Sequence, residues 1–157
     1  MSILEKIRTF LREHNTIFRE VHHEPTKTSE ESARARGEEL NVGGKALLIK
    51  VDAEFRLFVL SANRKADNKA IKKQFSASKI RFATAEELMT LTGLVPGSVP
   101  PFGEPILPLP LHVDPSVFQN ARIAFNAGSL TDSVVLDIED YRRVMNVTEV
   151  FPFSIEE

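Results

Sequence analysis

The chain has 157 residues, with 20 Lys and Arg against 22 Asp and Glu, and 42% of its residues are apolar. A chain of this length buries roughly 70% of its unfolded surface, so one core suffices and we expect a single domain over residues 1–157. It contains no Cys, which excludes disulfides, thiolate metal sites and a cysteine nucleophile. The apolar stretches are short and interrupted by charge, so we expect no signal peptide, no membrane span and a cytoplasmic location.

The formal net charge of -2 speaks against a dedicated nucleic-acid binder only if the charge is evenly spread. It is not: residues 45–81 hold ten basic and three acidic side chains, whereas residues 104–157 hold three and nine. Lys69, Lys72 and Lys73 belong to the basic segment. Two interpretations stay open, an ordinary solvated helix face or a local phosphate-binding patch on a protein with acidic flanks.

Start and stop signals predict four helices in the first two thirds of the chain. A capping residue precedes each helix, and in three of the four cases a Glu follows three residues later, which is the capping-box spacing. The capping residues are Ser2, Thr28, Asp67 and Thr84. Apolar periodicity extends the first helix over residues 3–11, the third is expected to run through Phe75, and glycines at 37 and 93 predict the ends of the other two.

Short β-prone segments predict five strands. They lie at residues 46–51, 55–62, 80–82, 123–127 and 134–138. The first two are expected to form a hairpin connected by Ala53 and Glu54. Asp140 is expected to begin a last helix through Met145, and the residues beyond Thr148 carry no clear signal.

Proline restricts the segment between residues 93 and 115, which contains seven of the nine prolines. Neither a continuous helix nor a central strand is expected there. Because strands and helices alternate without a regular βαβ period, the fold class predicted for the chain is mixed α/β, a mostly antiparallel mixed sheet surrounded by helices.

The densest motif is TGLVPGSVPPFG at residues 92–103, where three Gly and three Pro determine the path of an irregular loop. Such a loop can leave backbone N–H groups free for a ligand, and a rigid surface crossover is the alternative. It is neither a P-loop, because G-K-[ST] is missing, nor a nucleophile elbow, because Ser98 is not in a G-x-S-x-G context.

Two more segments are candidates for ligand contact. Lys45 follows Gly43 and Gly44 at the start of an apolar strand, where it can reach into a cleft or stay solvated. Asn126 lies at the end of another strand, after which the chain turns through Gly128. The segment is either an ordinary turn or a turn that places Asn126 against a ligand. The four histidines have no carboxylate at zinc-ligand spacing, so we expect no metal, and no cofactor is expected either.

Four segments, in this order, resemble the YbaK/ProX family, the aminoacyl-tRNA editing domain also found inserted in bacterial prolyl-tRNA synthetases. They are VHHEPTKTSEESA (21–33), GGKALLIK (43–50), TGLVPGSVPPFG (92–103) and NAGS (126–129). The resemblance covers almost the whole chain, and the K-x-L-L element together with the G-x-x-x-P loop is specific at this separation.

The resemblance implies hydrolysis of the ester that joins a wrong amino acid to the terminal adenosine of a tRNA, in trans when the domain stands alone. It implies aminoacyl-tRNA as the partner, foremost prolyl-tRNA with a small wrong amino acid, and a cognate synthetase as a second partner. Lys45 matches the active-site lysine of the family. The substrate-binding residues that it implies are Val99, Pro100, Pro101, Phe102, Gly103, Asn126, Gly128, His22, Thr28 and Ser29.

The residues agree with this chemistry, because an aminoacyl ester is already activated and needs a positioned water and oxyanion donors but no protein nucleophile. Backbone amides of Gly97 and Ser98 are the expected donors, and Lys45 is expected to hold the substrate. The general base stays unassigned, with the ribose hydroxyl of the tRNA as one candidate. Lys69, Lys72 and Lys73 are the candidate tRNA contacts. A non-catalytic module that binds a tRNA end, a nucleotide or a protein is the alternative function.

Overall fold

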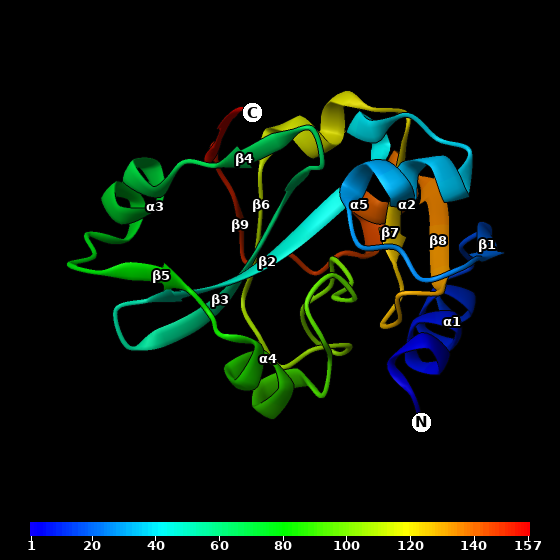
Figure 1. Ribbon diagram of the computed structural model, residues 1–157, viewed down its shortest axis with the longest axis horizontal. Helices are drawn as coiled ribbons and strands as arrows, with labels where there is room; N and C mark the ends of the chain where they lie inside the picture. The colour runs from blue at the N-terminus through cyan, green and yellow to red at the C-terminus, as the bar shows by residue number, and fades with distance from the viewer.

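The computed structural model describes residues 1–157 as two β-sheets, a two-stranded ribbon and five α-helices. Helix α3 and strand β5 lie at one end of the long axis, while α1 and the three-stranded sheet lie at the other (Figure 1). The mixed α/β architecture with flanking helices confirms the predicted fold class. None of the helices has the length and apolar character needed to cross a membrane.

The first four helices begin after the predicted capping residues. Their bounds are α1 (Ile3–Glu13), α2 (Ser29–Arg36), α3 (Asn68–Phe75), α4 (Ala85–Thr92) and α5 (Ile138–Val144). The capping box is complete at Thr84, whose hydroxyl accepts from the Glu87 N–H while the Glu87 carboxylate accepts from the Thr84 N–H. Helix α5 begins before Asp140, because Asp137 ends a strand and occupies the N-cap position, so Asp140 falls in the first turn.

The larger sheet has five strands. In spatial order they are β5 (Ile80–Phe82), β2 (Gly44–Val51), β3 (Glu54–Ser61), β6 (Leu111–Val113) and β9 (Glu149–Val150). Strands β2 and β3 form the predicted antiparallel hairpin. Its connection is Asp52 and Ala53, one residue earlier than predicted, because Asp52 adopts a φ of 51° and its carboxylate accepts the N–H groups of Ser78 and Lys79.

One strand corrects the prediction for the proline-rich segment. β6 lies inside the sheet, parallel to both β3 and β9. It fits between Pro110 and Pro115 because none of its three residues is proline, so all three N–H groups remain available for pairing. Pro110 itself contributes its carbonyl oxygen, which accepts the N–H of Leu57 at 2.9 Å.

The second sheet is antiparallel and has the order β1 (Phe18–His22), β8 (Asp132–Asp137) and β7 (Arg122–Asn126). A separate ribbon pairs β4 (Arg64–Ala66) with β10 (Ser154–Glu156). Strands β7 and β8 were predicted, whereas β1, β4, β9 and β10 were not. The last two lie beyond Thr148, and two or three residues carry too little periodicity to be recognised without their partners.

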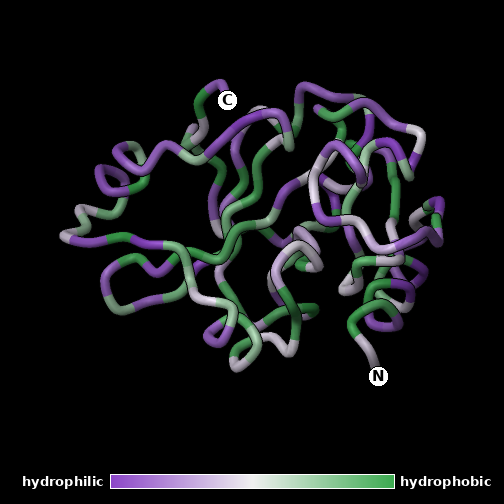
Figure 2. The backbone as a smooth tube through the Cα atoms, viewed as in Figure 1, coloured by the Kyte–Doolittle hydropathy of each residue, from purple (hydrophilic) through white to green (hydrophobic).

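Apolar residues concentrate along the middle of the sheet strands, while α3 and the segment leading to it are largely hydrophilic (Figure 2). The hairpin separates two cores: Leu48 and Val59 face the larger one, and Ile49 and Phe58 face the smaller one beneath α3. The two sheets meet at Gly44, where a Cβ would lie only 2.6 Å from Ile123 Cδ1. The second glycine of GGKALLIK is therefore required for close packing.

His112 of β6 is a buried polar residue in the smaller core, with 0% exposure. Its ring stacks on Phe58 with centroids 5.0 Å apart. The Arg56 guanidinium lies 3.3 Å from its Nε2, and a Glu149 carboxylate oxygen lies 3.2 Å from its Nδ1. Burial, reinforced by the Arg56 charge, lowers the pKa of His112 to about 4, so the folded protein keeps this imidazole neutral.

We expect the free energy of unfolding to decrease as the pH falls from about 6.5 to about 4, because unfolded His112 takes up a proton that the folded state excludes. The loss attributable to this group is on the order of 2–3 kcal/mol. Urea unfolding at pH 7, 5.5 and 4.5 measures it. His112→Phe should flatten this pH dependence, because the variant lacks the buried imidazole; an equally steep dependence in the variant would contradict the assignment.

Candidate functional site

A cavity of about 210 Å³ opens between α2, the start of β2 and the loop after α4. We call it the Lys45 cleft. Most of its lining residues are not hydrophobic, and they include four residues with hydroxyl side chains together with Gly97, Val99 and Asn126. The hydroxyl-bearing residues are Thr26, Thr28, Ser29 and Ser32. Lys45, Gly97, Val99, Asn126, Thr28 and Ser29 were all predicted as site residues, and the fold brings these six together.

Lys45 is the second residue of β2 and lines this cleft. Its Nζ donates to the backbone carbonyl oxygen of Arg64 at 2.8 Å. The Arg64 side chain in turn donates through Nε to the Ser154 hydroxyl at 2.6 Å, which ties β4 to the C-terminal strand β10. The ammonium group is therefore held by a backbone acceptor and has no carboxylate partner to neutralise it.

Arg36, the last residue of α2, is the main functional candidate that the sequence did not reveal. It is 7% exposed and lines the cleft. Its Nε donates to the Ser133 hydroxyl at 2.9 Å and its Nη2 to Asn126 Oδ1 at 3.0 Å. Burial lowers the pKa of Arg36 to about 10, so the guanidinium remains charged at neutral pH. The available signal was its position four residues after Ser32, which puts both on one helix face.

Asn126 connects this cation to the loop. Its Oδ1 accepts from Arg36 and from the Ser133 hydroxyl, and its Nδ2 donates to the Gly97 carbonyl oxygen at 2.7 Å. All the polar atoms of the Asn126 side chain are therefore engaged in orienting neighbours. The amide side chain holds the loop against the Arg36 wall of the cleft.

The backbone donors of the loop differ from the predicted pair. The Ser98 N–H donates to the Val95 carbonyl oxygen at 3.1 Å, its hydroxyl donates to the same oxygen at 2.7 Å, and the residue is buried. The N–H groups of Gly97 and Val99 have no acceptor within the protein. Donors for a ligand are therefore available at residues 97 and 99, on either side of Ser98.

The second half of the loop, Pro100 to Gly103, packs into the larger core instead of lining the cleft. Phe102 is 1% exposed and its ring lies 5.6 Å from that of Tyr141. The buried Tyr141 hydroxyl donates to the Pro101 carbonyl oxygen at 2.7 Å. A Cβ at Gly103 would lie 2.7 Å from the Leu109 carbonyl oxygen. These residues anchor the loop, and of the five implied substrate-binding residues between 99 and 103 only Val99 lines the cleft.

Gly128 and His22 also lie outside the cleft lining. Gly128 has a φ of 79°, and a Cβ there would lie 2.7 Å from Ile3, so it permits the turn to pack on α1. Its N–H donates to the Ser98 carbonyl oxygen at 2.9 Å, which supports the loop from behind. The His22 side chain is 79% exposed and contacts Asp132 at 2.9 Å; this hydrogen bond lowers the pKa of the Asp132 carboxyl.

The cleft offers cations and hydrogen-bond donors but no carboxyl or imidazole group. Lys27, Arg36 and Lys45 are its ionisable lining residues, and no Asp, Glu or His belongs to the lining. No cluster of three or more metal-ligating side chains occurs in the chain. Such a site can bind an anionic group or stabilise a developing oxyanion, because uncommitted N–H donors and two fixed cations surround the same space.

Comparison with known proteins supplies the family. Residues 23–144 match the model of the aminoacyl-tRNA editing domain. The chain is 34% identical over 146 residues to the multifunctional Ser/Thr-tRNA deacylase ProXp-y of Escherichia coli K12, which covers 89% of this chain and 86% of the relative. It is 32% identical over 101 residues to a proline–tRNA ligase of Shouchella clausii, covering 64% of this chain and 18% of the ligase.

A solved structure described as a trans-editing enzyme for prolyl-tRNA synthetase superposes with a TM-score of 0.82 at 22% identity, covering 100% of this chain and 98% of the other. At that identity the superposition supports the fold. The family assignment rests on the match over residues 23–144 and on the bacterial deacylase, which agree with the four motifs. The chain therefore belongs to the family of aminoacyl-tRNA editing domains.

Proposed function

We propose that this protein is a trans-acting deacylase that hydrolyses the ester of a mischarged tRNA, with residues 1–157 serving as one editing domain. One observation carries the proposal: Lys45, Arg36, Gly97 and Val99 line one cleft, and the N–H groups of Gly97 and Val99 have no acceptor within the protein. Hydrolysis of an activated ester needs such donors and cations, and it needs no protein nucleophile.

In this proposal the carbonyl oxygen of the ester becomes the oxyanion and lies near the Gly97 and Val99 N–H groups. Lys45 binds the substrate through charge and hydrogen bonding, and Arg36 supplies a second fixed positive charge. Since no carboxylate or imidazole lines the cleft, the ribose hydroxyl beside the ester is the proposed group that positions the water. Asn126 acts as a positioning residue, because its side chain is fully engaged with Arg36, Ser133 and Gly97.

For the substrate we propose a tRNA that carries a small amino acid, with prolyl-tRNA charged with the wrong residue as the leading candidate. The proline–tRNA ligase match supports the tRNA, and the relative named a Ser/Thr-tRNA deacylase supports serine and threonine as the amino acids. The hydroxyl-lined wall of the cleft favours a polar small side chain, because a site built to hydrogen-bond an OH group discriminates more strongly than an apolar pocket.

We expect Lys45→Ala to reduce the rate of deacylation by at least about 100-fold, since the variant lacks the ammonium group that is proposed to bind the substrate beside the reacting ester. The measurement is the rate of ester cleavage on a panel of tRNAs charged with Ser, Thr, Ala and the cognate amino acid. Lys65→Ala serves as the matched control, because Lys65 is an exposed lysine of β4, two strands further along the chain. Cleavage of no panel member by the unmodified protein would refute the proposed activity.

Arg36→Lys tests whether the guanidinium fork matters beyond its charge. The lysine keeps the positive charge but cannot bind Ser133 and Asn126 together, so we expect kcat to fall by about 10- to 100-fold and unfolding to become easier by about 1–2 kcal/mol. Arg34→Lys, on the exposed side of the same helix, is the control. Equal kinetics for the two variants would exclude a role for the network.

The alternative is a non-catalytic module that binds a tRNA end, a nucleotide or a protein. Tight binding of aminoacyl-tRNA with no ester cleavage above the buffer rate would favour it. The free N–H groups at residues 97 and 99 and the cation pair favour turnover, because binding a neutral ester does not require donors of this kind.

A further inference from the structure

Phe82 is an aromatic side chain that the proposed chemistry leaves unexplained. It ends the edge strand β5 and is 55% exposed. It borders a second, mostly apolar cavity of about 150 Å³, which we call the apolar annex. The annex shares Ala46, Leu47, Gly97 and Val99 with the Lys45 cleft, so the two cavities adjoin each other.

Strand register puts this ring on the same side of the sheet as Lys45. Phe82 pairs with Ile49 of β2, and residues 45, 47 and 49 point to one face because side chains alternate along a strand. Four residues of strand separate Lys45 from Ile49, a distance of about 13 Å. The ring is therefore offset along β2 from the cleft that is proposed to hold the ester.

A third cavity lies around the same edge strand. It has a volume of about 390 Å³ and contains the side chains of Lys50, Lys72, Lys79 and Arg81 with one carboxylate, Asp52. Arg81 is paired with Glu87 through two hydrogen bonds of 2.8 and 2.9 Å. The three lysines form no ion pair. We call this group the basic cavity.

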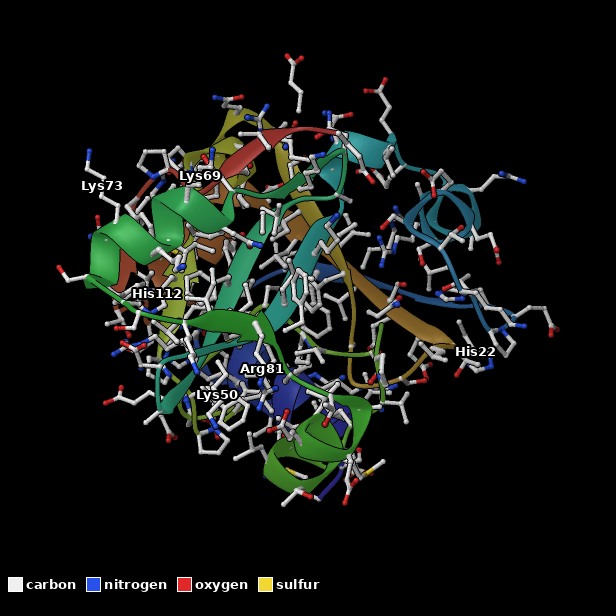
Figure 3. All side chains as sticks on the ribbon, turned by 60° about the vertical axis from the view of Figure 1, so that its left-hand side comes forward. His22, Lys50, Lys69, Lys73, Arg81 and His112 are labelled. Carbon is white, nitrogen blue, oxygen red and sulfur yellow. The ribbon has the colours of Figure 1, made fainter.

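Lys50 and Arg81 face each other on the paired strands β2 and β5, whereas Lys73 projects from the outer side of α3, away from them (Figure 3). Of the three lysines of α3, Lys72 is the one that lines the basic cavity. The positive charge is therefore concentrated around the edge strand β5 and not along the whole helix. Arg81 and Phe82 are consecutive residues of that strand, so their side chains leave its edge toward opposite faces of the sheet.

We propose that Phe82 and the basic cavity bind the single-stranded acceptor end of the tRNA, with Phe82 stacking on an unpaired base and Lys50, Lys72 and Lys79 holding phosphates. This inference rests on the proposed function of the Lys45 cleft. Exposed aromatic rings beside basic grooves are the usual means of binding single-stranded nucleic acid, because every base has a face to stack and every nucleotide a phosphate to pair.

Phe82 is tested with three substitutions and a readout that needs no catalysis, the dissociation constant for uncharged tRNA. Phe82→Ala and Phe82→Leu should weaken binding by about 5- to 150-fold, whereas Phe82→Tyr should retain it, because stacking requires the ring and not only apolar area. Ile17→Ala truncates another exposed apolar side chain, 89% exposed and distant along the chain, and should bind like the unmodified protein.

The lysines are tested by the salt dependence of the same binding. Lys72→Gln combined with Lys79→Gln should reduce the slope of log affinity against log salt concentration by about 1.5, since each phosphate contact contributes about 0.7–0.9. Lys6→Gln combined with Arg12→Gln changes the net charge equally on α1 and should leave the slope unchanged.

Cleavage of a serine ester of adenosine separates this inference from the proposed function. Such a minimal ester lacks the upstream nucleotides, so the Phe82 and lysine variants should cleave it at the unmodified rate while losing activity on aminoacyl-tRNA. Unchanged tRNA affinity in Phe82→Leu, or equal slopes for the two double variants, would overturn the inference. Failure to cleave either substrate with intact tRNA binding would instead refute the deacylase activity.

Discussion

A buried guanidinium without a carboxylate partner organises the cleft of this protein. Burying a cation is costly unless its donors are satisfied, and Arg36 meets this requirement with the neutral acceptors Ser133 and Asn126. The nearby Glu38 carboxylate is occupied by Arg19 and Arg122. The positive charge of Arg36 therefore remains available in the cleft, and the same hydrogen bonds join α2 to β7, β8 and, through Asn126, to the loop at Gly97.

The loop of residues 97–103, which faces this network, has two halves that differ in their contacts. Gly97 and Val99 line the cleft with N–H groups that have no acceptor, while Phe102 and its neighbours are buried against Tyr141 and α1. Because the buried half is held by packing and by the Tyr141 hydrogen bond, the exposed half is presented with little freedom. Preorganised donors of this kind stabilise a developing charge without a reorganisation cost at the moment of reaction.

Helices and family motifs were largely predictable from the sequence, because capping residues, glycine stops and the four motifs are local patterns. Five of the ten strands were predicted, among them the three-residue β5, while the five-residue β1 was missed, so length alone did not decide which strands were recognised. β1, β4, β9 and β10 escaped detection, and β6 was excluded by its flanking prolines, since pairing partners far along the chain decide whether such short segments become strands. The net charge of -2 was also uninformative by itself, because the basic residues of segment 45–81 are offset by acidic residues on either side of it.

For the candidate site, residue types and spacing pointed to Lys45, Asn126 and the glycine-rich loop, and in the structure Lys45, Asn126 and Gly97 line one cleft. Tertiary structure decided the rest. It buried Arg36 in the cleft wall, left Val99 instead of Ser98 as the free N–H donor beside Gly97, and placed Phe102 and His22 outside the cleft. The physical reason is that the availability of a donor, the burial of a side chain and the face it occupies depend on contacts between residues distant in the chain, such as Arg36 and Ser133. Such contacts cannot be predicted from the neighbouring residues in the sequence.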